Sequence, residues 1–265
     1  MAPLSGIIVP LERVPDPAFA QRLVGDGVSI DPMSDRVLAP CDARILQVHR
    51  AHHAVTLSAR GLEIIIHVGL DTVLLNGEGF TALVKAGDTV RTGDALLSFD
   101  ADLVARRARS LLTQVVVSNV ESVAGIEASQ GFVTAGHDTL MRILLAERSD
   151  ASQAPAQSEA VRSKPIVITA SGGLHARPAA MITTAARRFT ADVRLLSGAR
   201  EANARSVVSI MALEVGQGDE VTIVATGSDA REAIAAISAL LASDLSSEAP
   251  EAAHAGGVAA PPPAP

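Results

Sequence analysis

The hexapeptide GLHARP at residues 173–178 places a histidine and an arginine at the start of an alanine-rich helical pattern. Pro178 has the backbone angle of a first helical turn and lacks an N–H group that such a turn leaves unpaired. Residues at helical spacing predict a helix from Pro178 to about Phe189. His175 then stands ahead of free N–H groups and a positive dipole end, where anions bind, and Arg177 adds further donors. The pattern suits a histidine that carries a phosphoryl group; the plain alternative is a surface histidine near a helix start.

A second candidate is a pair of histidines in the first half of the chain. Apolar runs at 55–58 and 62–68 flank Ala59-Arg60-Gly61, which predicts a hairpin with a three-residue loop. If the hairpin centres on Arg60, His53 and His67 pair directly, with Cβ atoms roughly 5 Å apart. A slip of one residue would put them on opposite faces. Two facing imidazoles could bind one zinc ion, or one could orient a phosphoryl group held by the other; a chance pair on a half-buried sheet is the alternative.

The composition narrows the classes of function. The chain has 265 residues, 48% of them hydrophobic but only 2% aromatic, with no Trp or Tyr, which disfavours stacking platforms for single-stranded nucleic acid. A net charge of −7 disfavours nucleic acid or an anionic membrane as the main partner. The single cysteine, Cys41, excludes an intrachain disulfide and a multi-cysteine metal site. No apolar run of about 20 residues is present, so we expect no membrane insertion and a cytoplasmic protein.

The elements that must position these histidines fall into two domains. Residues 1–148 contain short apolar runs cut by Gly, Pro and Asp, which predicts an all-β sandwich or barrel with one helical stretch at 100–112. The predicted strands are 7–10, 28–30, 44–49, 55–58, 63–68, 96–99, 114–118 and 142–145.

Residues 149–164 are small and polar without periodicity, which predicts a flexible linker. Residues 165–247 alternate strands and helices, which predicts an α+β open-faced sandwich. Its predicted elements are strands 166–169, 192–196, 201–204 and 220–225 and helices 178–189, 206–213 and 229–241. Residues 248–265 are rich in Ala and Pro, and we expect them to be disordered, like a second linker that leads to a further domain.

The decapeptide SGGLHARPAA at residues 171–180 resembles the active-site segment of HPr, the histidine phosphocarrier of the bacterial sugar phosphotransferase system. The resemblance covers residues 165–247 and includes ARSVVSIMAL at 204–213. The first half resembles the glucose-type enzyme IIA of the same system, through EIIIHVGLDTV at 63–73 and GEGF at 77–80. Two earlier segments, at 5–19 and 25–30, match as well, so this resemblance covers about residues 1–148. Together they resemble the front part of a multiphosphoryl transfer protein, in which an enzyme I domain can follow.

The resemblance implies a phosphotransferase that needs no cofactor. His175 would accept phosphate from enzyme I and phosphoenolpyruvate, and His67 would be the second phosphorylated residue. His53 would be the active-site partner of His67, and Arg177 would stabilise the phosphoryl group on His175. The phosphate would then pass to a sugar-specific membrane component, enzyme IIB/IIC.

Four further positions follow from the same resemblance. Asp71 corresponds to an acidic residue on the partner-docking rim, and Val207 and Val208 belong to the docking segment of the phosphocarrier. Ser206 resembles a residue that a regulatory kinase phosphorylates, although serine is also a preferred helix N-cap, which is the reading we favour.

The chain departs from the family patterns at a few places. Residues 41–43, Cys-Asp-Ala, and His52 differ from the usual enzyme IIA residues, and Gly172 and Ala176 replace bulkier polar residues of the phosphocarrier. We expect these changes to affect docking affinity more than the chemistry of phosphoryl transfer. From residue 166 to 211 there are six Arg against two acids, while residues 1–150 have 13 Lys/Arg against 18 Asp/Glu. A basic carrier face and an acidic acceptor face would be complementary.

Two other functions are compatible with parts of the sequence. The unphosphorylated first domain could be a regulatory module that docks on permeases or metabolic enzymes such as kinases. A zinc hydrolase is disfavoured, because the Gly-Asp repeat at 87–94 lacks an accompanying His-x-His ligand pair.

Overall fold

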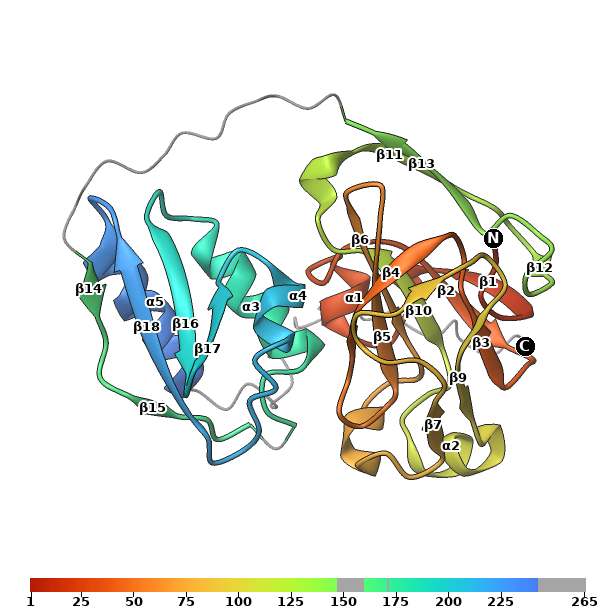
Figure 1. Cartoon of the computed structure of the whole chain (residues 1–265), viewed down its shortest axis with the longest axis horizontal. Coiled ribbons are helices and arrows are strands. Elements are labelled where there is room, and N and C mark those ends of the chain that lie inside the picture. Colours follow the sequence, from red (N-terminus) through yellow and green to blue (C-terminus); the bar gives the residue numbers. More distant parts are fainter. Residues whose placement is uncertain (147–159, 171, 243–265) are drawn as a thin grey trace, which may run out of the picture.

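The structure, a computed structural model, describes residues 1–146, 160–170 and 172–242 and arranges them as two domains packed side by side (Figure 1). In the first domain the strands are β1 (Gly6–Pro10), β2 (Asp26–Pro32), β3 (Arg36–Leu38), β4 (Ala43–Val48), β5 (Ala54–Ala59), β6 (Leu62–His67), β7 (Phe80–Ala82), β8 (Thr89–Val90), β9 (Ala95–Phe99), β10 (Thr113–Val117), β11 (Val123–Ala128), β12 (Phe132–Val133) and β13 (Met141–Leu145). Its helices are α1 (Pro17–Ala20) and α2 (Ala101–Arg107), with 3-10 turns η1 (Leu11–Arg13), η2 (Thr72–Leu75) and η3 (Val120–Ser122).

The first domain is built from antiparallel strands, as the punctuated apolar runs predict. The main sheet has the order β12-β1-β2-β10-β6-β5-β4-β8, and it is joined by the small sheets β3-β9-β7 and β11-β13. Ile64 and Ile66 of β6 point into this domain's own apolar core, which also holds Leu57 and Val115. Alternate residues of the same strands, such as Ile65, therefore point out of the opposite side of the sheet.

The second domain has the predicted α+β architecture. Its elements are β14 (Val161–Arg162), β15 (Ile166–Val167), α3 (Ala176–Ala186), β16 (Asp192–Ser197), β17 (Arg200–Asn203), α4 (Val207–Met211), β18 (Glu220–Thr226) and α5 (Ala230–Ala242). The sheet order is β14-β18-β16-β17, and β15 also pairs with β18. Every second residue of β18 is buried, so one face of the sheet is covered, and α5 packs against β18 and β16.

Three sequence-based boundaries need correction or lie outside the described residues. The predicted linker 149–164 is wrong at its end, because Val161 and Arg162 form β14 and pair with Ala225 and Val224 of β18. The rest of that linker through residue 159, and the predicted tail 248–265, lie outside the described residues. Helix α3 begins at Ala176, two residues before the predicted start, which leaves Pro178 in the first turn, where its missing N–H is not needed.

The predicted hairpin register is also wrong by one residue. Arg60 and Gly61, with φ of 52° and 84°, form a two-residue turn in place of the three-residue loop, so His67 lies opposite Ala54 and not opposite His53. Positive φ at both central residues is what a type I′ turn requires. His53 precedes β5, and the chain turns at His52, where φ is 55°. That turn brings the His53 ring beside His67 despite the shift.

A single apolar cluster runs across the boundary between the domains. On the first-domain side it contains Phe19, Ile65 and Val116, and on the second-domain side Val208 and Met211 of α4. We call the outward side of β4, β5, β6 and β10 together with α1 the docking face. Burial of this face against α3 and α4 holds His67 and His175 next to one another.

Candidate active site at the domain boundary

His67 ends β6 on the docking face and is buried. Its Nδ1 donates to the carbonyl oxygen of Gly69 at 2.9 Å, because a carbonyl can only accept, and the lone pair is therefore on Nε2. Gly69 has φ of 72°, and a Cβ there would lie 2.8 Å from the Ser110 carbonyl oxygen, so the turn that supplies this acceptor needs glycine. Burial lowers the pKa of His67 to about 4, which keeps the ring neutral at physiological pH.

His53 and His49 extend the site into a row of three imidazoles. The ring centroids of His53 and His67 are 4.8 Å apart, and those of His49 and His53 are 4.4 Å apart. His53 is only 1% exposed, and burial holds its pKa well below the usual range. Burial also lowers the pKa of His49 to about 4, with His67 and His175 adding to the effect. His49 was not predicted as a site residue. It ends a predicted strand, but no motif in the sequence includes it.

His175 reaches the same place from the second domain. It is the N-cap residue of α3, and its carbonyl accepts from the N–H of Ala179 at 3.0 Å. The ring is held by a hydrogen bond from Nδ1 to the Gly173 carbonyl at 3.1 Å. Gly173 has φ of 66°, and a Cβ there would collide with the Val215 carbonyl, so this residue also has to be glycine. Burial lowers the pKa of His175, and the neighbouring Arg177 lowers it further.

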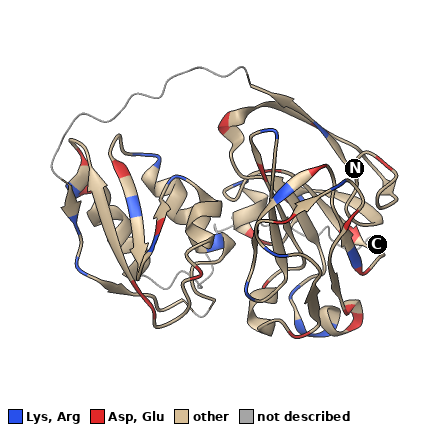
Figure 2. Ribbon diagram, in the orientation of Figure 1, with Lys and Arg blue, Asp and Glu red and all other residues tan. Residues whose placement is uncertain are grey.

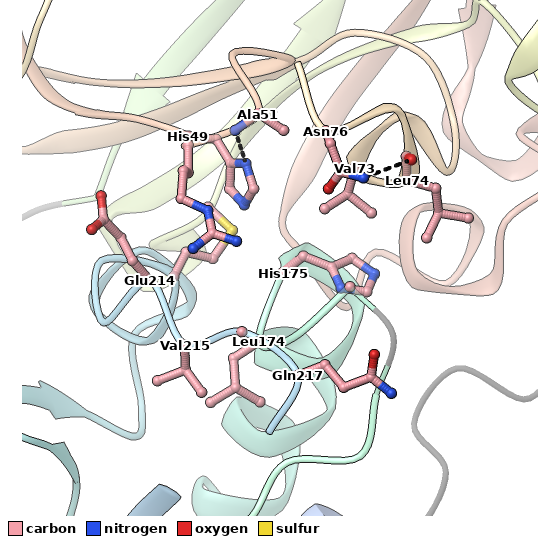
Figure 3. A pocket seen from close by; sticks show the side chains of 14 residues that line it. His49, Ala51, Val73, Leu74, Asn76, Leu174, His175, Glu214, Val215 and Gln217 are labelled. Atoms are coloured by element: carbon pink, nitrogen blue, oxygen red, sulfur yellow. Dashed lines mark hydrogen bonds between the residues drawn. The ribbon is translucent and has the colours of Figure 1, made fainter. Parts of the chain in front are cut away.

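Two cavities meet at His175. The smaller one, of about 20 Å³, lies between the domains and is lined by both His67 and His175, together with Arg177 and Asp16. The larger one, of about 320 Å³, is lined by His49, His175 and residues of both domains (Figure 3). In Figure 3 the Nδ1 of His49 accepts from the Ala51 N–H at 3.2 Å, which leaves its other nitrogen as an N–H donor on the cavity side.

Arg177 is engaged by carboxylates of the first domain. Its Nη2 forms a short hydrogen-bonded ion pair with Asp16 and lies 3.7 Å from Asp71. The Asp16 side chain is 5% exposed, that of Arg177 18% and that of Asp71 35%, so Asp16 makes the more buried contact. Asp71, the residue predicted from the resemblance, does lie on the docking rim. Asp16 was missed, because an aspartate before a proline reads as a helix N-cap, and it does accept from the Ala18 N–H at the start of α1.

The remaining predicted docking residues lie on or beside α4. Val207 and Val208 are buried in the cluster that joins the domains. Ser206 is the N-cap of α4 and accepts from the Ser209 N–H at 3.1 Å, as the N-cap interpretation predicts. Ser206 also lies close enough to Glu63 of β6 to lower the pKa of that carboxyl group, although burial raises this pKa overall. Ser206 is therefore a cap and a contact to the first domain at once.

Charge complementarity between the domains is local. Figure 2 shows both signs mixed over each domain, so neither presents a uniformly charged surface. Across the boundary, however, Arg177 pairs with Asp16, and Arg187 lies 3.4 Å from Glu121. In both pairs the arginine comes from the second domain and the acid from the first domain. This distribution of charge is the one that the residue counts predict.

The described residues set limits on other kinds of site. Among them no group of three or more His, Cys, Asp or Glu side chains could hold a metal ion. No helix in the described part of the chain is long and apolar enough to cross a membrane. Cys41 is half-buried, and burial raises the pKa of its thiol, so it is poorly suited to act as a nucleophile.

Comparison with known proteins finds a separate family match for each half of the chain. Residues 1–123 match the family described as the phosphoenolpyruvate-dependent sugar phosphotransferase system, EIIA 1, and residues 162–243 match the PTS HPr component phosphorylation site. The glucose-specific EIIA component of Halalkalibacterium halodurans is 48% identical over 144 residues, which are 54% of this chain and 83% of that protein. The corresponding protein of Haemophilus influenzae is 38% identical over 143 residues, 54% of this chain and 86% of that protein.

Two solved structures are similar to the separate halves. The glucose permease IIA of Mycoplasma capricolum is 30% identical and covers 54% of this chain and 91% of its own, with a TM-score of 0.48. The phosphocarrier HPr of Bacillus anthracis is 39% identical and covers 31% of this chain and 96% of its own, with a TM-score of 0.30.

Proposed function

Because the chain belongs to the glucose-type enzyme IIA family of the sugar phosphotransferase system and carries an HPr domain behind it, we propose that it passes a phosphoryl group from His175 to His67 within one molecule. The protein is a phosphohistidine relay, and the observation that supports intramolecular transfer is the shared cavity. His67 and His175, 108 positions apart in the sequence, line the same space of about 20 Å³. Arg177 and Asp16 close this space from opposite domains.

Transfer in this site exchanges one N–P bond for another. The neutral His67 ring attacks the phosphorus through Nε2, the bond to the His175 ring breaks, and the released electron pair restores a neutral His175. Positive charge that develops on the His67 ring is stabilised at Nδ1–H by the Gly69 carbonyl. The rings are already neutral and oriented, so positioning supplies most of the catalysis. His53 packs against His67 and orients the ring without carrying phosphate.

Phosphate uptake from enzyme I and phosphate delivery to the IIB component both require the domains to separate. In the docked arrangement His67 is buried and His175 is largely covered, so neither can reach a large protein partner. We propose that enzyme I charges His175 in the separated state, and that a membrane IIB component collects phosphate from His67 after a second separation. These exchanges take place in the cytoplasm, at the inner side of the sugar permease.

The relay itself works through histidine without a resident cofactor. Zinc takes four ligands in structural sites, and His53 and His67 could supply at most two of them. The Nδ1 of His67 is already bound to Gly69, which leaves Nε2 as the ligand atom. A zinc ion at this pair would therefore take its other ligands from a docked partner protein.

A regulatory role of the first domain is the second candidate. The apolar docking face, with Phe19, Ile65 and Val116, is covered here by α4 and would be uncovered when the domains separate. An apolar face around an unphosphorylated His67 suits the capture of a permease or a metabolic enzyme. A phosphoryl group on His67 would place negative charge on that face and release the partner.

Two substitutions test the intramolecular route. A His175→Ala chain and a His67→Ala chain, mixed with enzyme I and phosphoenolpyruvate, can transfer phosphate only between molecules. We expect the transfer rate of the mixture to fall with dilution and that of the parent chain to stay constant. Equal concentration dependence would refute intramolecular transfer. Phosphate mapping without acid should find label on His175 and His67, and label on His53 would reverse the proposed roles.

A further inference from the structure

A hydrogen bond away from the histidines joins the two domains. The Nε2 of Gln47 on β4 donates to the carbonyl oxygen of Met211 at 2.9 Å, and the contact is buried. Met211 ends α4, and its carbonyl also accepts from the Glu214 N–H at 3.0 Å, so both of its lone pairs are used. This bond fixes the position of α4, the helix that carries Val207 and Val208, against the docking face.

A bulge in β4 aims Gln47 at the second domain. Ile45 pairs with Leu57 and Gln47 pairs with Thr56, so Leu46 is an extra residue without a partner on β5. Bulges of this kind redirect a side chain and increase the local twist. Thr56 in turn pairs with Ile65, which lies on the docking face. The inserted residue therefore places Gln47 on the face that contacts α4, while Leu46 is 38% exposed.

Because Gln47 is buried, its hydrogen bond to Met211 contributes to docking. Gln47 is 7% exposed, and its Oε1 is buried without a hydrogen-bond partner among the described residues. A buried amide costs free energy unless it is hydrogen-bonded, so the bond to Met211 is what makes the closed arrangement favourable at this point. A partner surface without a carbonyl in this position would leave the whole amide unsatisfied.

We propose that Gln47 is a positioning residue, which holds α4 of the HPr domain against the docking face by hydrogen bonding to the Met211 carbonyl and so aligns His175 with His67. The proposal rests on the proposed intramolecular transfer. It is separate from the chemistry, because Gln47 lines neither of the two cavities at His175.

Matched substitutions in the full chain test this role. Gln47→Glu keeps the shape but replaces the amide donor with a carboxylate oxygen, which can only accept and would face the Met211 carbonyl, whereas Gln47→Lys keeps a donor. Leu46→Glu adds the same charge one residue away at an exposed position and serves as the control. In single-turnover transfer from His175 to His67, Gln47→Glu should be slower by about tenfold or more. Gln47→Lys should stay within about threefold of the parent, and Leu46→Glu should not differ from it.

A second measurement separates docking from folding. The phosphate donor is a His67→Ala chain that is phosphorylated on His175. The acceptor is a His175→Ala chain, with or without Gln47→Glu. We expect Gln47→Glu to raise the KM for the acceptor while kcat and the thermal unfolding temperature change little.

Several results would overturn the proposal: parent-like transfer by Gln47→Glu, an equal loss in Gln47→Lys or Leu46→Glu, or a loss in kcat alone. Failure of the underlying relay would look different, since the parent chain itself would then show no label on His67.

Discussion

Asp16 should contribute far more to docking than Asp71, although only Asp71 was predicted from the sequence. In Asp16→Asn the Oδ1 can still accept from the Ala18 N–H, so the cap of α1 is kept and only the charge is lost. The substitution removes the buried ion pair of Arg177 with Asp16 and keeps the longer contact of the same guanidinium to Asp71, at 3.7 Å. Breaking a buried pair costs about 3–5 kcal/mol, and we take about 3 kcal/mol because Asp71 compensates in part.

That loss corresponds to roughly a hundredfold fall in the docking equilibrium, at about 1.4 kcal/mol for each factor of ten. Asp71→Asn removes a half-exposed contact, for which about 0–1 kcal/mol is typical, and should lower docking by about fivefold at most. Rapid-quench measurement of transfer from His175 to His67 reports both effects, and calorimetry of the first domain checks that the fold is kept.

The transfer rates of the two variants test whether burial determines the strength of the ion pair. If Asp71→Asn slows transfer as much as Asp16→Asn, burial of the ion pair does not determine its strength. If Asp16→Asn transfers at the parent rate, Arg177 does not hold the domains together. Arg177→Lys provides a matched check, because lysine keeps the charge but loses the planar fork that can serve both carboxylates.

Three further outcomes are expected. Burial lowers the pKa values of His49, His67 and His175 in the docked state. Docking should therefore be complete above about pH 6.5, the ordinary pKa of histidine, and should weaken as the pH falls below it. Small-angle scattering that shows no opening of the two domains between pH 7.5 and 5.5 would contradict this. His53→Gln should still accept phosphate on His67 but deliver it slowly to the IIB component, since the ring that orients His67 is lost; unchanged delivery would argue against that role. Ser206→Glu should slow intramolecular transfer by placing a second carboxylate beside Glu63, whereas Ser206→Thr keeps the cap and should not; equal rates for the two variants would show that this contact is unimportant.

Local sequence patterns were enough to predict a helix that starts next to His175. The segment before Pro178 predicts a histidine at a helix start, and His175 is the N-cap of α3. The strand and helix patterns predict an all-β domain followed by an α+β domain, and both are present. These features depend on residues close together in the chain, whose backbone preferences and side-chain periodicity act over a few positions. The two-residue strands β8 and β14 escaped prediction because so short a pattern carries little signal.

The pairing of His53 and His67 was not predicted correctly from local sequence patterns. Loop length alone does not set a hairpin register, and the two-residue turn at Arg60 moved every predicted pair by one position. The rings of His53 and His67 still meet, because the left-handed residue His52 redirects the chain just before β5. Sequence therefore determined which residue types are available, while the turn geometry decided which of them face one another.

The two halves of the relay come together only in the tertiary structure. Asp16 and Arg177 are 161 positions apart, and Gln47 and Met211 are 164 apart. Neither pair has a local signature, because each contact depends on how two folded domains dock and, for Gln47, on one extra residue in β4. The sequence by itself predicted two domains with a candidate phosphorylated histidine in each. Docking decided that these histidines share one cavity, since burying the apolar face of the sheet against α4 is what brings them together.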